Sequence, residues 1–181
     1  MNPGEERFER AFETCSAPVM AYALRRVGTR EDAEDVLAET FAVAWRRRDE
    51  IPEPPLPWLY AVAANVVRNN RRSSRRLGRL RSKLAGQPPS QGDDHADHVA
   101  ANDAFAIAFA SLSESQREIL RLVAWEGLDT RDGAVALECS ETAFKVRLHR
   151  ARRELEKQMA EAGHVEGELT EPSLTPEAGS E

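Results

Sequence analysis

The spacing of apolar residues along this chain predicts helices, and the clearest of them covers residues 31–48. Residues of one face recur at helical intervals over four turns. That face consists of Ala33, Val36, Leu37, Thr40, Phe41, Ala44 and Trp45. Thr29, with Asp32 three residues later, resembles a capping box at its start. The opposite face carries Glu31, Asp35 and Glu39, which are either a solvated surface or a docking strip for a basic partner. Composition alone favours the solvated surface.

Upstream of this helix, the pattern predicts two shorter helices. Phe8, Phe12 and Cys15 stand at helical spacing. Pro18 suits the first turn of a second helix that runs to about Val27, because proline at that position loses no helical hydrogen bond.

Downstream, a proline-rich connector at residues 51–57 leads into a helix with one apolar and one basic side. The apolar side is formed by Leu59, Val62, Ala63 and Val66. The other side bears the polar residues Asn65, Arg68, Asn69, Arg72 and Arg75, preceded by Trp58 and Tyr60. Arginines suit phosphates, amides suit base edges and aromatic rings can stack on bases, so this helix is a candidate for nucleic-acid binding. For Tyr60, packing in the core is the favoured interpretation.

The charge distribution strengthens this interpretation. The chain of 181 residues has a net charge of −6, yet residues 61–86 contain eight arginines or lysines and no acidic residue. Charges of one sign at this density repel one another unless a polyanion neutralises them. The basic segment therefore points to a phosphate-bearing partner.

The sequence predicts an all-α fold of two small helical domains joined by a flexible linker. The first domain covers residues 1–78, and residues 79–98 form a linker rich in turn residues. The second domain covers residues 99–160. Residues 161–181 form an acidic tail that we expect to be disordered and solvating. His95 and His98 have no further ligand nearby, so we expect no metal there.

The second domain ends in a predicted helix-turn-helix. Three short helices are expected. The first covers residues 104–112, the second begins at a capping box of Ser113 with Gln116 and stops at Gly127, and the third covers residues 130–137. A turn at residues 138–140 then leads into a helix capped by Ser140. The buried stripe of this last helix is Phe144, Leu148, Ala151 and Leu155, and its free face is Lys145, Val146, His149, Arg150 and Arg153. Gly133 is a weak point in the preceding helix, because glycine costs about 1 kcal/mol relative to alanine there.

Several classes of function find no support in the sequence. Cys15 and Cys139 are isolated, which fits a reduced, cytoplasmic protein. No apolar run is long enough to span a membrane. No catalytic constellation, metal motif or glycine-rich phosphate loop is present, so we expect neither an enzyme nor a cofactor.

The order of these features resembles the two-domain sigma factors of the extracytoplasmic-function group, which direct bacterial RNA polymerase to promoters. DAEDVLAETFAVAW at residues 32–45 resembles the helix that docks on the polymerase. PWLYAVAANVVRNNRR at residues 57–72 resembles the segment that reads and melts the −10 element. LSESQREIL at 112–120, EGL at 126–128 and VRLHRAR at 146–152 resemble the domain that reads the −35 element.

The resemblance implies partners and roles. The partners are core RNA polymerase, promoter DNA and an anti-sigma factor. Polymerase docking falls to Glu31, Asp35 and Glu39. Contacts with the −10 element fall to Trp58, Asn65, Arg68, Asn69, Arg71, Arg72 and Arg75. Contacts with the −35 element fall to Lys145, Val146, Arg147, His149, Arg150 and Arg153.

The sequence also departs from the family pattern at individual positions. Ala38 stands where a glutamine is usual on the docking helix, and Ala64 replaces a common polar residue before Asn65. Glu138 occupies a turn position where glycine is usual, and Gly133 stands where a larger apolar residue is common. These departures affect the details of DNA and polymerase contact more than the resemblance itself.

The competing hypothesis is a stand-alone helix-turn-helix repressor or activator. It accounts equally well for residues 140–155. It does not account for the second basic segment at residues 61–86 or for the acidic helix before it.

Overall fold

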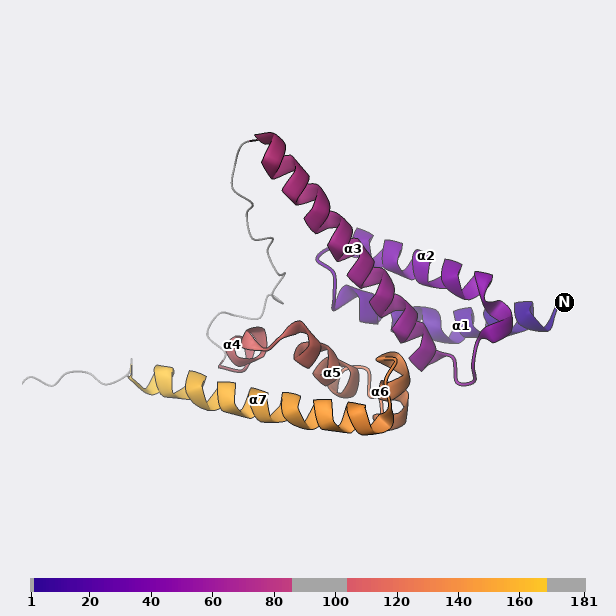
Figure 1. Cartoon of the computed structure of the whole chain (residues 1–181). Helices are drawn as coiled ribbons and strands as arrows, with labels where there is room; N and C mark the ends of the chain where they lie inside the picture. Colours follow the sequence, from indigo (N-terminus) through magenta and orange to yellow (C-terminus); the bar gives the residue numbers. More distant parts are fainter. Residues whose placement is uncertain (1, 86–103, 169–181) are drawn as a thin grey trace, which may run out of the picture.

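The computed structural model describes residues 2–85 and 104–168, and its side chains over residues 2–73 and 104–161. These residues form helices and no strands (Figure 1). The elements in chain order are α1 (Pro3–Leu24), α2 (Arg30–Arg46), η1 (Arg48–Glu50), α3 (Leu56–Ala85), α4 (Ala104–Ser111), α5 (Glu114–Ala124), α6 (Thr130–Ala136) and α7 (Glu141–Glu168). The predicted all-α fold of two helical domains is confirmed.

The first domain is a bundle of α1, α2 and α3 around a closely packed core. Val19, Val36 and Leu59, one from each helix, are completely buried. Local signals set where the first two helices begin. Asn2 forms a capping box with Glu5 at the start of α1, and the Thr29 hydroxyl accepts a hydrogen bond of 3.0 Å from the Asp32 backbone at the start of α2.

The expected break at Pro18 is wrong, because α1 runs through this proline without interruption. Proline lacks an N–H, so the carbonyl of Thr14 loses its helical partner, at a cost of about 3 kcal/mol. Beyond the proline, Val19, Tyr22 and Ala23 are all buried in the core. Tertiary packing of that last turn and a half outweighs the local cost.

Both long helices continue past the predicted domain boundaries. The backbone of α3 remains helical to Ala85, beyond the expected end of the first domain at residue 78, and α7 continues to Glu168, beyond residue 160. The arginines, leucines and glutamates of these extensions are good helix formers. The rest of the expected linker, residues 86–98, and of the expected tail, residues 169–181, lies outside the described residues.

The second domain packs α4, α5 and α6 against α7. Ser113 with Gln116 forms the predicted capping box of α5, and the Ser140 hydroxyl accepts a hydrogen bond of 3.2 Å from the Ala143 backbone at the start of α7. Phe144 and Ala151 of the predicted stripe are fully buried. The turn between α6 and α7 at residues 137–140 gives the predicted helix-turn-helix.

The interpretation of Gly133 as a weak point is wrong. This glycine is buried in α6 directly under the ring of Phe144, and a Cβ atom built on it would lie only 2.2 Å from Cζ of that ring. The missing side chain is therefore what allows α6 and α7 to approach.

The two domains pack against one another. Leu122, Leu128 and Ala136 of the second domain belong to the same buried cluster as the core of the first. Between the two domains, α3 packs against α6 (Figure 1). We call this packed arrangement of the two domains the closed form. It determines which candidate residues are exposed and which are paired across the domains.

Candidate nucleic-acid interface

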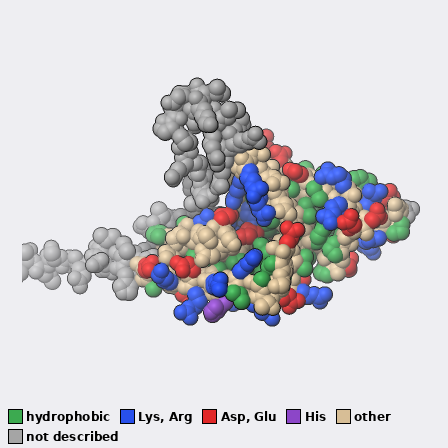
Figure 2. Space-filling model, viewed as in Figure 1, with side chains coloured by type: hydrophobic (Ala, Val, Ile, Leu, Met, Phe, Trp, Pro, Cys, Tyr) green, Lys and Arg blue, Asp and Glu red, His purple; other side chains and the backbone are tan. Residues whose placement is uncertain are grey.

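The −35 candidates all lie on the free face of α7. Each of the six side chains is exposed, and none makes an ion pair with a described residue. They are Lys145, Val146, Arg147, His149, Arg150 and Arg153. Figure 2 shows basic side chains gathered along this helix. With Phe144 and Ala151 holding the opposite stripe in the core, α7 presents one continuous surface of donors and a valine methyl group.

The −10 candidates lie on α3, and the structure places them less uniformly. Arg68, Asn69 and Arg72 are exposed, whereas Asn65 and Arg71 are half-buried against the second domain. The side chain of Arg75 lies outside the described residues.

The two aromatic residues at the start of α3 have different positions. Tyr60 is buried, and its ring stacks on that of Tyr22 with 4.9 Å between ring centroids, so its predicted core position is confirmed. Trp58 is half-buried, and the guanidinium of Arg47 lies 5.4 Å from its ring centroid. Trp58 is therefore partly accessible to solvent.

The acidic candidates Glu31, Asp35 and Glu39 lie one helical turn apart on α2. All three are exposed, and none forms an ion pair with a residue that the structure describes. The neighbouring Ala38 is exposed as well. The result is an uncompensated acidic strip on the outside of the first domain.

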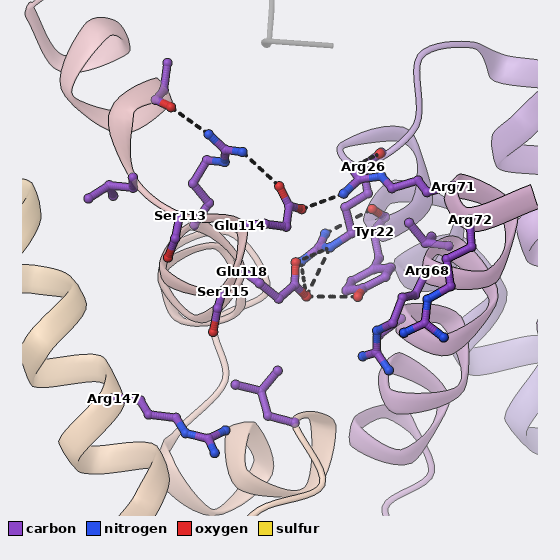
Figure 3. Close-up of a pocket in the computed structure, with 16 residues that line it drawn as sticks. Tyr22, Arg26, Arg68, Arg71, Arg72, Ser113, Glu114, Ser115, Glu118 and Arg147 are labelled. Atoms are coloured by element: carbon purple, nitrogen blue, oxygen red, sulfur yellow. Dashed lines mark hydrogen bonds and ion pairs between the residues drawn. The ribbon is translucent and has the colours of Figure 1, made fainter. Parts of the chain in front are cut away.

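Arginines of the two domains meet at a cavity of about 740 Å³ between them. Arg68 and Arg72 of α3 line it from one domain, and Arg147 of α7 lines it from the other. Figure 3 shows these side chains reaching into it from opposite sides. The sequence predicted the two basic surfaces separately, and the fold brings their edges together.

A buried ion-pair cluster holds the domains in this arrangement. The guanidinium of Arg26 at the end of α1 donates to both oxygens of Glu118, at 3.2 and 2.9 Å, and to Glu126 at 2.9 Å. The Tyr22 hydroxyl donates to Glu118 at 2.9 Å, and Arg25 pairs with Glu126. The side chains of Arg26 and Glu126 are only 2% and 1% exposed. A charge so deeply buried requires its partner, since an unpaired one costs several kcal/mol.

This environment changes the protonation of the tyrosines. Burial, reinforced by the charge of Glu118, raises the pKa of Tyr22 well above its usual value. Burial and the charge of Glu126 raise the pKa of Tyr60 to about 12. Burial lowers the pKa of Arg26, but Tyr22 and Glu118 raise it by more, so it stays charged. The cluster is ionised at the arginine and neutral at both tyrosines near neutral pH.

A second contact between the domains involves the −10 candidate Arg71. Arg71 donates to Glu114 of α5 at 2.7 Å and to the backbone carbonyl of Arg26 at 2.8 Å. Burial raises the pKa of Glu114, but hydrogen bonds from Arg71 and Arg117 outweigh this effect and lower it to about 2. In the closed form, Arg71 is thus paired with a carboxylate of the other domain.

Glu138 makes a third contact, with Asn65, whose amide donates to its carboxylate at 3.5 Å. The backbone of Glu138 has φ of +49°, in the left-handed region that favours glycine. The departure from glycine at this turn therefore coincides with a contact to the −10 candidate helix.

Sequence reasoning missed the residues of the ion-pair cluster. Arg26 and Glu118 are 92 positions apart, and Arg25 and Glu126 are 101 apart. Each looks like an ordinary surface charge in its own segment of the chain. No local spacing links them, so only the packing of the domains could reveal them.

Other chemistry is limited among the described residues. No group of histidine, cysteine, aspartate or glutamate residues there could hold a metal ion. Cys15 and Cys139 carry free thiols, the first buried and the second half-buried. None of the described helices is long and apolar enough to cross a bilayer.

Comparison with known proteins assigns each of the two domains to a family. Residues 11–77 match the family model of sigma-70 region 2, and residues 104–155 match that of sigma-70 region 4. Together they define a two-domain protein of the sigma-70 class.

Curated relatives narrow the class. The chain is 31% identical over 156 residues to the ECF RNA polymerase sigma factor SigL of Mycobacterium tuberculosis, covering 84% of this chain and 88% of the relative. It is 30% identical over 142 residues to the ECF RNA polymerase sigma factor EcfG of Rhodopseudomonas palustris, covering 75% of each. The chain belongs to the extracytoplasmic-function sigma factors, and it is a promoter-recognising sigma factor.

Solved structures support the fold. The sigma factor RpoE of Bartonella quintana, crystallised with the anti-sigma factor NepR, aligns with a TM-score of 0.59 at 24% identity, covering 84% of this chain and 96% of that one. CnrH, in complex with the cytosolic domain of CnrY, aligns with a TM-score of 0.58 at 23% identity, covering 86% and 89%. The stand-alone regulator is disfavoured, because it leaves the match of residues 11–77 unexplained.

Proposed function

We propose that this sigma factor divides promoter recognition among three of its helices. The acidic strip of α2 docks on core RNA polymerase, α3 reads the −10 element and α7 reads the −35 element. The observation that carries this division is that the six α7 candidates, together with Glu31, Asp35 and Glu39, are exposed and make no ion pair with a residue that the structure describes. Groups that pair with nothing in their own fold are available to partners of opposite charge.

On α7, the division of labour follows from position. Lys145, Val146, His149 and Arg150 face the major groove, where arginine and lysine read guanine and a valine methyl group contacts thymine. Arg147 and Arg153 lie towards its edges and hold backbone phosphates. Phosphate contacts orient the helix, and contacts to base edges make it specific.

On α3, the arginines bind promoter phosphates and the amides bind a base. Arg68, Arg71, Arg72 and Arg75 hold the strand. Asn65 and Asn69, with Trp58 beside them, bind an unstacked base of the −10 element. Unpairing a base costs a few kcal/mol, so strand opening requires a site that receives it.

Promoter binding requires the closed form to open. The −35 and −10 elements lie about 25 base pairs apart, or roughly 85 Å at 3.4 Å per base pair. In the closed form, Arg72 and Arg147 line one cavity, and Arg71 is paired with Glu114. The α3 helix cannot reach the −10 element while α7 reaches the −35 element unless the two domains separate. Polymerase then sets the distance between the domains. The free protein should therefore bind promoter DNA poorly.

The proposed partners are core RNA polymerase, promoter DNA and an anti-sigma factor. The structures of both solved relatives named above contain a partner protein, and the partner of RpoE is called an anti-sigma factor. We place the protein in the cytoplasm, where polymerase acts. Sigma factors are transcription initiation factors without enzymatic activity, and we propose neither catalysis nor a cofactor for this chain.

Run-off transcription with core RNA polymerase over a promoter library tests the proposal. Arg150→Ala should change base preference at the −35 element, whereas Arg72→Ala should weaken initiation on all promoters alike. A matched control is Arg30→Ala, which removes an exposed arginine of α2 that pairs only with Glu34. No promoter-specific transcript with any core enzyme, or tight sequence-specific DNA binding by the free protein at physiological salt, would contradict it.

A further inference from the structure

In the closed form, the cavity between the domains is lined by more positive than negative side chains. Six arginines and two glutamates line it. The glutamates already have partners: Glu114 pairs with Arg71 and Arg117, and Glu118 pairs with Arg26. The three remaining arginines are Arg68, Arg72 and Arg147.

These three guanidinium groups are not neutralised within the described structure. Arg68 donates only to the neutral amide oxygen of Asn65, at 2.9 Å. Arg72 and Arg147 make no hydrogen bond or ion pair with a described residue. Three like charges around one cavity repel one another, and an anion among them would remove that repulsion.

The shape and lining suit a small ligand. A volume of about 740 Å³ lies within the range of small-molecule sites. Guanidinium forks bind phosphate oxygens in pairs. The exposed Ser115 offers a hydroxyl donor on the same lining, and Leu112 and Leu137 supply an apolar wall.

We propose that this cavity binds a small polyphosphate, either an inorganic oligophosphate or the phosphate chain of a nucleotide. The ligand is held by Arg68 and Arg72 from α3 and by Arg147 from α7, so it bridges the two domains. It stabilises the closed form and covers arginines that promoter phosphates need. Its effect on the sigma factor is inhibitory.

Isothermal titration calorimetry of the purified full chain tests the proposal without polymerase or DNA, so its result is independent of the proposed promoter contacts. The probes are tripolyphosphate and magnesium-free ATP, with sulfate as the reference anion, all at constant ionic strength. We expect saturable binding of tripolyphosphate at one site. If ATP binds as strongly as tripolyphosphate, the phosphate chain alone is sufficient for binding. If ATP binds more tightly than tripolyphosphate, the ligand is a nucleotide. If ATP does not bind, the ligand is an inorganic oligophosphate.

The matched variants are Arg147→Gln and Arg150→Gln, which remove the same exposed charge one turn apart on α7. Only Arg147 lines the cavity. Losing one charged phosphate contact should weaken tripolyphosphate binding about tenfold in Arg147→Gln and in Arg72→Gln. Arg150→Gln should change it less than about twofold.

Three results overturn the proposal. The first is no saturable binding of either phosphate probe. The second is sulfate binding as strong as tripolyphosphate binding, or an equal loss in Arg147→Gln and Arg150→Gln, because either would show a general attraction to anions. The third is a loss confined to one domain's arginine, because the ligand would then not bridge the domains.

Discussion

Replacing Gly133 with alanine tests how α6 and α7 are held together. The new Cβ atom would lie 2.2 Å from Cζ and 2.5 Å from Cε2 of Phe144. Carbon atoms pack at about 3.5 Å, so the ring would have to retreat by more than about 1 Å. Phe144 is fully buried, so it has no free space into which to move.

The magnitude follows from two opposing effects. Overpacking of a core costs about 1–3 kcal/mol, and an overlap this large belongs at the upper end. Alanine recovers about 1 kcal/mol of helix propensity relative to glycine. We therefore expect Gly133→Ala to lower the free energy of unfolding by about 2 kcal/mol, and the Tm by roughly 4–8 °C.

The assay is thermal and urea unfolding of the full chain, followed by circular dichroism. Phe144→Leu is the matched background, because it shortens the side chain that meets the new methyl group. In that background, Gly133→Ala should be neutral or stabilising. If Gly133→Ala raised the Tm of the parent protein, or cost the same in both backgrounds, the packing argument would be refuted.

Three further predictions concern the contacts between the domains. Glu126→Ala leaves the buried Arg26 with one fewer partner, and it should cost about 3 kcal/mol and open the closed form; an unchanged radius of gyration in X-ray scattering would contradict this. The pKa of Glu114 is lowered to about 2 from its usual value near 4.5. The ionised carboxylate therefore stabilises the closed form fully above pH 4.5, and this stabilisation is lost as the pH falls from 4.5 towards 2. Glu114→Gln removes the carboxylate, so it should abolish the part of the domain opening in acid that the titration of Glu114 causes. The raised pKa values of Tyr22 and Tyr60, the only two tyrosines, mean that the native chain should show little tyrosinate absorbance at about pH 11, where the unfolded chain is largely ionised. The contribution of the two tyrosines to stability is therefore complete below pH 10, and that of Tyr60 is lost as the pH rises from 10 to about 12. Ionisation of both tyrosines near pH 10 in the native chain would refute their burial.

The closed form also explains why the charges on this chain divide into two kinds. Glu31, Asp35 and Glu39 of α2 and the basic −35 candidates of α7 are exposed and make no ion pair with a described residue, which suits contact with partners. Those just after α1 pair across the domains with carboxylates on α5 and just after it, and two of these charged side chains, Arg26 and Glu126, are almost completely buried. Opening the domains for promoter binding must expose the apolar surface that Leu122, Leu128 and Ala136 bury, and the loss of that burial is a physical reason for the free protein to remain closed.

From Thr29 onwards, the sequence by itself indicated the helices and, at α2, α5 and α7, where they begin. Helical periodicity and N-caps depend on residues within a few positions of one another, so Thr29, Ser113 and Ser140 could be identified from local spacing. The exposed face of α7 follows from the same periodicity, because its opposite stripe has to be buried.

Only the tertiary structure decided what these helices meet. It carried α1 through Pro18, because buried neighbours outweigh a lost hydrogen bond. It made Gly133 a close contact rather than a defect, and it paired Arg26 with Glu118 across 92 positions of sequence. Burial and long-range pairing are properties of the space around a residue, and residues distant in the sequence determine that space.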